Sequence, residues 1–225
     1  MSTAILPRTA GLRLWGFSGT SLAVAVVLGA WLALVVLLGA AGGFLTAPGI
    51  PPWPIALGFA VPLGLFLVLL RLSGSFREFV LALDPRLLVA IQAWRFEGIG
   101  FLALYASKVL PGMFALPAGL GDIAIGATAP WLVLTLIRQP AFAGSRLFRV
   151  WNGLGILDLV VAIAAGALGA ALASGAPGEI TTSAMAQLPL VLFPAYLVPI
   201  HLMLHIASLM QGRALRSVDP QRSET

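Results

Sequence analysis

The feature that most constrains this chain is a series of long apolar runs, each near the length that spans a membrane. A helix needs roughly 20 consecutive apolar residues to cross the hydrocarbon core of a bilayer. Six runs approach or exceed that length: 22–45, 55–70, 85–110, 118–137, 150–173 and 188–210. The sequence therefore predicts an all-α integral membrane protein with six transmembrane helices.

Composition supports this class and removes several others. Of 225 residues, 60% are hydrophobic and 9% are charged, whereas a soluble domain carries about 25% charged residues. The net charge of +5 is spread over short loops without a basic patch, so we expect the lipid bilayer as partner and no nucleic acid. The absence of cysteine excludes disulfides, cysteine-ligated metals and thiol catalysis.

A short segment between the second and third runs has helical periodicity of its own. Ser75 followed by Glu78 fits a capping box. Apolar residues then recur at i, i+3, i+4 and i+7: Phe76, Phe79, Val80 and Leu83. This pattern predicts a short amphipathic helix lying in the membrane interface. Asp84 and Pro85 fit the N-cap and first position of the third span.

Basic residues outside the spans fall almost entirely on one side. Lys108 lies at one end of the predicted bundle. The other end receives eleven arginines: Arg8, Arg13, Arg71, Arg77, Arg86, Arg138, Arg146, Arg149, Arg213, Arg216 and Arg222. The positive-inside rule then predicts cytoplasmic termini and an inner-membrane location. The predicted organisation is a cytoplasmic segment at 1–18, a transmembrane domain at 19–212 and a cytoplasmic polar tail at 213–225.

The third predicted span carries charges where they are costly unless paired or hydrated. Gln92 and Arg95 share one helix face, whereas Glu97 points nearly the opposite way and Lys108 returns to the Glu97 face three turns later. Two interpretations of Arg95 remain open, a buried ion pair and a side chain that snorkels to the cytoplasmic interface. Glu97 is too short to reach that interface.

Small residues form one face of the fourth predicted span, where they favour close helix packing. That face comprises Gly119, Asp122, Gly126 and Ala129. We expect Asp122 to cap the start of this helix and to pair with Lys108 across the outer hairpin.

The last two spans add further polar groups. Asn152 lies near the cytoplasmic end of the fifth span and Asp158 near its middle. The sixth span has prolines at 189, 194 and 199, which free backbone carbonyls. His201 and His205 follow at i, i+4 on one face.

These polar residues share a depth in the membrane, which favours one intramembrane polar site over separate packing hydrogen bonds between helices. The predicted site comprises Arg95, Glu97, Asp158, His201 and His205, supported by Gln92, Asn152, Lys108 and Asp122.

Three functions fit this pattern. The first is a small proton- or ion-coupled transporter or permease, since a proline-interrupted helix and ionisable groups at one depth suit a pathway; a chain of this size would need a homodimer. The second is a metal or haem (redox) protein using His201 and His205 as ligands. A bis-histidine haem is disfavoured because neighbours on one helix face cannot occupy opposite sides of one iron. The third is an assembly or regulatory subunit of a membrane complex.

No motif favours an enzyme. His201 is followed by Leu202 and Met203 rather than the glutamate of a metalloprotease helix, and no serine motif or closely spaced carboxylate pair suggests an intramembrane hydrolase. The sequence indicates neither the substrate nor a cofactor.

Overall fold

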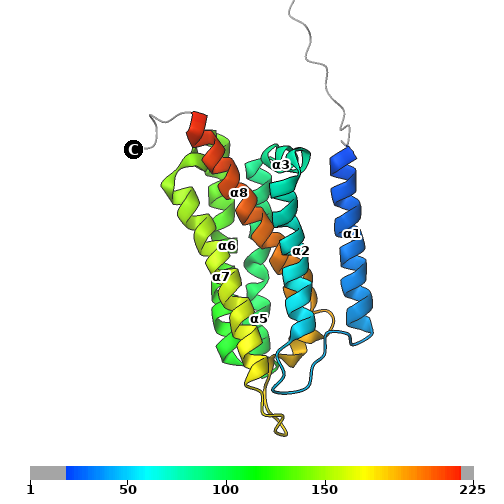
Figure 1. The fold of residues 1–225 in the computed structure, drawn as a ribbon. Coiled ribbons are helices and arrows are strands. Elements are labelled where there is room, and N and C mark those ends of the chain that lie inside the picture. The colour runs from blue at the N-terminus through cyan, green and yellow to red at the C-terminus, as the bar shows by residue number, and fades with distance from the viewer. Residues whose placement is uncertain (1–18, 219–225) are drawn as a thin grey trace, which may run out of the picture.

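The computed structural model describes residues 19–218, which form helices joined by loops (Figure 1). Six helical segments are long and apolar enough to cross a membrane, which confirms the predicted all-α membrane fold. They are α1 (Gly19–Ala40), α2 (Trp53–Leu72), the composite Pro85–Ala106, α6 (Gly112–Arg138), α7 (Arg146–Ala171) and the composite Phe193–Leu215. The predicted segment at 1–18 lies outside the described residues.

The third span is not the continuous helix that the sequence predicts. It consists of α4 (Pro85–Gln92), a 3-10 segment η1 (Ala93–Glu97) and α5 (Gly98–Ala106). A 3-10 helix winds more tightly than an α-helix, so the angles expected between Arg95 and Glu97 no longer hold. The change of winding falls at the two charged residues.

The fourth span begins at Gly112, six residues before the predicted start at Ala118. Pro117 and Pro130 lie within it. Its small-residue face packs as predicted: a Cβ atom added at Gly98 of α5 would lie 2.6 Å from the carbonyl oxygen of Gly119, and one at Gly126 would collide with the backbone of Phe96. Side chains at these glycines would therefore push α6 away from the third span.

The sixth span starts later and runs further than predicted. Residues 188–191 form a turn, the π-helical segment η4 covers Phe193–Leu197, and α8 covers Val198–Val218. The predicted polar tail therefore begins inside a helix, and its residues 219–225 lie outside the described part of the chain. Two short segments, η2 (Pro140–Gly144) and η3 (Thr182–Ala186), complete the connections.

The predicted amphipathic helix is present as α3 (Gly74–Leu81), but its cap differs. Ser73, not Ser75, accepts the hydrogen bond from the Phe76 N–H at 3.2 Å, because the helix starts one residue before Ser75. From α8, the buried Gln211 donates its amide to the carbonyls of Val80 (3.1 Å) and Leu83 (2.7 Å). The end of α3 is thereby fixed to the last span.

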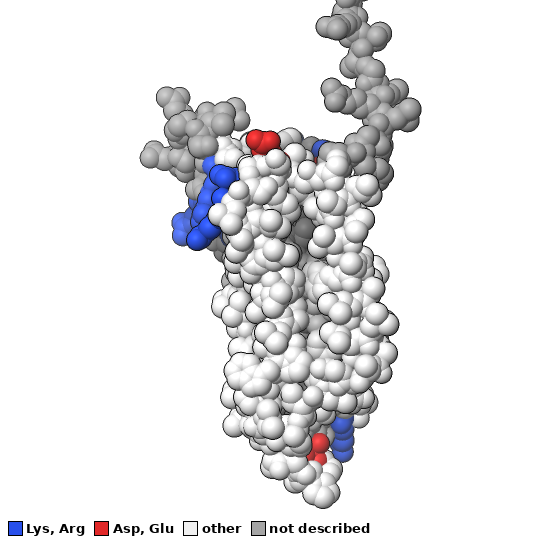
Figure 2. All heavy atoms as spheres, turned by 45° about the vertical axis from the view of Figure 1, so that its right-hand side comes forward, with Lys and Arg blue, Asp and Glu red and all other residues white. Residues whose placement is uncertain are grey.

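The helices alternate in direction, so α1 begins and α8 ends at the same end of the bundle (Figure 1). Lysine and arginine gather mostly at that end, and a broad band without charge separates it from the other end (Figure 2). Arg71, Arg138 and Arg146 mark the arginine-rich end, where α2 and α6 finish and α7 begins. Lys108 lies in the opposite turn, between α5 and α6.

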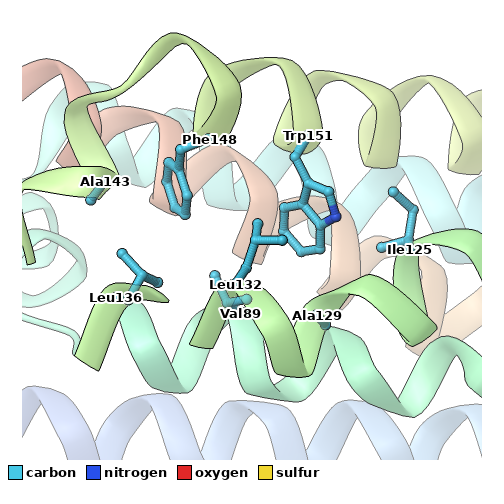
Figure 3. Close-up of a cluster of buried hydrophobic side chains, with 8 residues drawn as sticks. All are labelled: Val89, Ile125, Ala129, Leu132, Leu136, Ala143, Phe148 and Trp151. Carbon is cyan, nitrogen blue, oxygen red and sulfur yellow. The ribbon is translucent and has the colours of Figure 1, made fainter. Parts of the chain in front are cut away.

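Near the arginine-rich end, an apolar cluster joins α6 and α7 (Figure 3). Phe148 and Trp151 of α7 point toward Leu132 of α6 and Val89 of α4 (Figure 3). The Trp151 indole donates to the Thr128 hydroxyl at 2.8 Å. This cluster forms one wall of the polar site, because the Trp151 ring also packs edge-on against the His205 ring.

Candidate functional site

Arg95 is the centre of a buried polar cluster. It is 0% exposed, which contradicts the snorkelling interpretation. Its Nε donates to Asp122 Oδ1 at 2.7 Å, its Nη2 donates to Asp158, and its Nη1 donates to the Gly155 carbonyl at 3.4 Å. A guanidinium can satisfy several acceptors in this way because its five N–H groups form a fixed planar fork.

The cluster lies near mid-membrane by helix length. Arg95 is ten residues from the start of its span and Asp122 is ten residues into α6 from the opposite end. At about 1.5 Å per residue, each position is about 15 Å deep, which is half of a hydrocarbon core of about 30 Å. Asp122 therefore neither caps a helix start nor pairs with Lys108, as the sequence analysis expected. Lys108 is exposed at the end of the bundle.

His205 extends the cluster through a defined tautomer. Arg95 Nη1 lies 3.1 Å from His205 Nε2, and His205 Nδ1 lies 2.9 Å from Asn152 Oδ1. Because arginine only donates, Nε2 must accept and Nδ1 must carry the proton. Asn152 Oδ1 accepts the hydrogen bond from that N–H, and the Asn152 amide donates to the Phe148 carbonyl at 2.8 Å. Each donor nitrogen in this series of hydrogen bonds, from Arg95 through His205 to Asn152, therefore has an acceptor.

Two glycines leave the space that the cluster occupies. A Cβ atom on Gly121 of α6 would overlap the Asp158 carboxylate, and one on Gly155 of α7 would overlap the His205 ring. Such close approach of backbone to side chain requires residues without a Cβ. The glycines thus allow polar side chains from neighbouring helices to reach Arg95.

A cavity of about 180 Å³ lies beside the cluster. It runs from loop residues such as Thr46 and Thr181, at the end of the bundle opposite the arginines, to Glu97, Asp122 and His201. Most of the remaining wall is apolar, with Phe59, Phe101, Phe114, Phe193 and Leu197 among the residues that line it. The inner end of a mainly apolar cavity is therefore polar.

The predicted site residues divide into two groups. Arg95 contacts Asp158 and His205 directly, and the supporting residues Asp122 and Asn152 bond to Arg95 and His205 respectively. Glu97 and His201 line the cavity instead, and Glu97 takes part in none of the salt bridges among the described residues. Gln92 is buried and donates to the His201 carbonyl at 3.2 Å. Lys108 lies outside both groups.

The predicted metal pair is not arranged as a ligand set. Both ring nitrogens of His205 are occupied by Arg95 and Asn152, so this ring has no lone pair left to share with His201. Within the described residues, no group of three or more histidine or carboxylate side chains is placed to hold a metal ion.

Sequence reasoning missed two parts of the site. The first is the role of Asp122: if the fourth span began at Ala118, Asp122 would lie near its start. Because α6 begins at Gly112, Asp122 lies at the same depth as Arg95. The cavity-lining phenylalanines were also missed, since apolar residues facing a cavity and those facing lipid are alike in sequence. The same holds on α6, where Leu132, buried in the cluster of Figure 3, is only two residues from the exposed Leu134.

The fold and the cluster together define the class of protein: a helical membrane protein with an ion-paired arginine in the middle of its bundle. The chain belongs to the family described as a domain of unknown function (DUF8737), which matches residues 52–212. No curated protein and no solved structure matches it. The matched region begins after α1 and includes every residue of the cluster and most of the cavity wall.

Proposed function

We propose that this protein is a small proton- or ion-coupled transporter, in which the cavity receives the substrate and the Arg95 cluster couples its movement to an ion. One observation carries this proposal: a cavity of about 180 Å³ reaches from one end of the bundle to Glu97, Asp122 and His201, where Asp122 is paired with the fully buried Arg95. Ionisable groups at membrane depth commonly mark substrate and ion pathways.

The charges of the cluster support a coupling role. Arg95 faces two carboxylates, Asp122 and Asp158, and Glu97 lines the cavity beside them. With all three carboxylates ionised, one guanidinium leaves an excess of negative charge. Because uncompensated charge is costly within a bilayer, this arrangement favours uptake of a proton or another cation.

Orientation is part of the proposal. The arginine-rich end would face the cytoplasm of an inner membrane under the positive-inside rule, so the loop end of the cavity would face the opposite compartment. Movement of substrate then requires a second conformation open toward the arginines. A homodimer in which the two bundles support each other during this change remains part of the proposal.

The test is reconstitution into liposomes containing a pH-sensitive dye, across candidate ions and small metabolites. Wild type should show substrate-dependent proton movement, Asp158→Asn should lose it, and His201→Gln should fold normally and lose its pH dependence. A single change at Arg95 or Asp158 leaves an uncompensated buried charge, so the double variant Arg95→Gln/Asp158→Asn should recover some of the folding that a single variant loses but stay inactive. Activity of His201→Gln equal to wild type under every condition would contradict a coupling site at this cavity and favour a purely structural cluster.

A further inference from the structure

We propose that the cavity binds a small organic monocation with a compact apolar body, such as an aralkylammonium, and that Glu97 and His201 hold its charged group. This inference rests on the proposed function, because it names the substrate class of the same cavity. Three properties of the cavity carry it: the charge of its inner end, an unpaired buried imidazole, and the size and chemistry of its wall.

The inner end of the cavity offers acceptors without an accessible cation. Glu97 and Asp122 line it, and none of the described lining residues is lysine or arginine. Arg95 lies behind Asp122 and is 0% exposed. A ligand entering from the loop end therefore meets carboxylates, which favour a cation and repel an anion. Asp122 is already ion-paired with Arg95, whereas Glu97 takes part in none of the salt bridges among the described residues, so Glu97 is the carboxylate better placed to hold a cation.

His201 supplies a second, independent observation. It is only 3% exposed and lines the cavity, yet its ring forms none of the hydrogen bonds found among the described residues. A buried polar group without a partner is costly, so buried polar side chains nearly always have one. An ammonium N–H donating to the acceptor nitrogen of His201 would give that nitrogen a partner. Its neighbour His205, by contrast, has both nitrogens occupied.

The wall and volume limit the rest of the ligand. Phe59, Phe101, Phe114 and Phe193 line the cavity, and aromatic faces attract organic cations. A dry cavity of about 150 Å³ is known to accommodate benzene, so a cavity of about 180 Å³ suits one ring with a short amine. Benzylammonium is therefore an appropriate probe, with benzyl alcohol and benzoate as neutral and anionic analogues of the same shape.

The experiment uses the native lack of cysteine. Ala162 lines the cavity, and Ala162→Cys in purified full-length protein is treated with the small neutral reagent methyl methanethiosulfonate, with and without each analogue. Benzylammonium should protect the thiol at a concentration about tenfold lower than benzyl alcohol, as expected for a hydrogen bond to a charged group, and benzoate should not protect. The exposed Ser107→Cys should react equally in all cases.

A second variant isolates the carboxylate. Adding Glu97→Gln should abolish the preference for benzylammonium while benzyl alcohol still protects, which shows that the cavity is intact; Glu78→Gln, at an exposed position outside the cavity, should change nothing. Equal protection by the cation and the alcohol, or an unchanged preference in Glu97→Gln, overturns the ligand class but leaves the proposed function standing. A thiol at residue 162 that reacts only after denaturation overturns the cavity itself, and the proposed function with it.

Discussion

The first span and the last differ in how much protein surrounds them. In α1, 6% of the residues in the apolar window are buried inside the protein, against 44% in Phe193–Leu215. The first is a regular helix without charges; the last begins with a π-helical turn and carries His201 and His205. Because lipid tails are as apolar as leucine, an uncharged helix needs no protein cover, whereas a helix with polar groups does.

Irregular winding occurs in two of the four spans that contribute to the cluster, whereas α6 and α7 are continuous α-helices. The third span changes to a 3-10 segment at Arg95 and Glu97, and the sixth contains the π-helical turn before His201. Both irregular forms recur at functional sites. The comparison therefore separates a lipid-facing rim from a polar centre. Three predictions test that separation, from the largest expected effect to the smallest, and a fourth concerns a loop outside both.

Removing the central cation should have the largest effect. Arg95→Gln leaves Asp122 and Asp158 buried without their partner, and we expect a loss of about 3–5 kcal/mol in the free energy of unfolding. The control is Arg86→Gln, which breaks an exposed ion pair with Asp84 and should cost at most about 1 kcal/mol. The measurement is unfolding in detergent. Equal costs for the two variants would contradict a buried, ion-paired centre.

Glycine substitutions along one helix should differ sharply. Gly155→Ala places a Cβ atom on the His205 ring, and the displacement should cost about 1–3 kcal/mol. Two residues away, Gly153 faces open space, so Gly153→Ala should be neutral or stabilising by up to about 1 kcal/mol, since alanine favours the helix. Thermal unfolding of both variants checks this, and a stable Gly155→Ala would mean that α7 lies further from His205.

Within α1, a side chain that meets the bundle should matter more than one that faces away from it. Val35 is 2% exposed and belongs to the same buried cluster as Val191 and Ala195, so Val35→Ala should cost about 1 kcal/mol. Leu37 is 68% exposed and would face lipid, so Leu37→Ala should change the melting temperature little. A larger effect at Leu37 would indicate that another protein covers the rim.

The loop before η3 should show the smallest effect, and it should depend on pH. Glu179 accepts from the Ser174 N–H and hydroxyl and from the Gly175 N–H, and these bonds hold the pKa of the Glu179 carboxyl below its ordinary value. Because the pKa is lower in the folded state, the ionised carboxylate stabilises the loop at any pH above the ordinary pKa of glutamate. That stabilisation is lost as the pH falls through the lowered pKa of the folded state. The protection of the Ser174 amide against hydrogen exchange, measured relative to its intrinsic rate at each pH, should therefore fall only in acid below the ordinary pKa of glutamate, or at neutral pH in Glu179→Gln.

The spans could be predicted from the sequence, but not all of the contacts between them. Apolar length is a local property, so six spans were predictable, and so was the shared depth of Arg95, Asp158 and His205. The partner of Asp122 was not, because it depends on a six-residue difference in where α6 begins. The 3-10 turn at Arg95 contains no proline or glycine, so the sequence carries no signal that predicts it. The two partners of the His205 ring could not be predicted either, because Arg95 and Asn152 come from other helices.

The claim that a cavity leads from the Lys108 end to the polar centre can be tested by labelling from one side of the membrane. Oriented vesicles carrying Ala162→Cys are treated with a membrane-impermeant cationic methanethiosulfonate, alongside Ser107→Cys near Lys108 and Gln139→Cys at the arginine-rich end. Ala162→Cys should react from the side that labels Ser107→Cys, and Glu97→Gln should slow that reaction. Reaction only from the side that labels Gln139→Cys, or none from either side, would contradict the account.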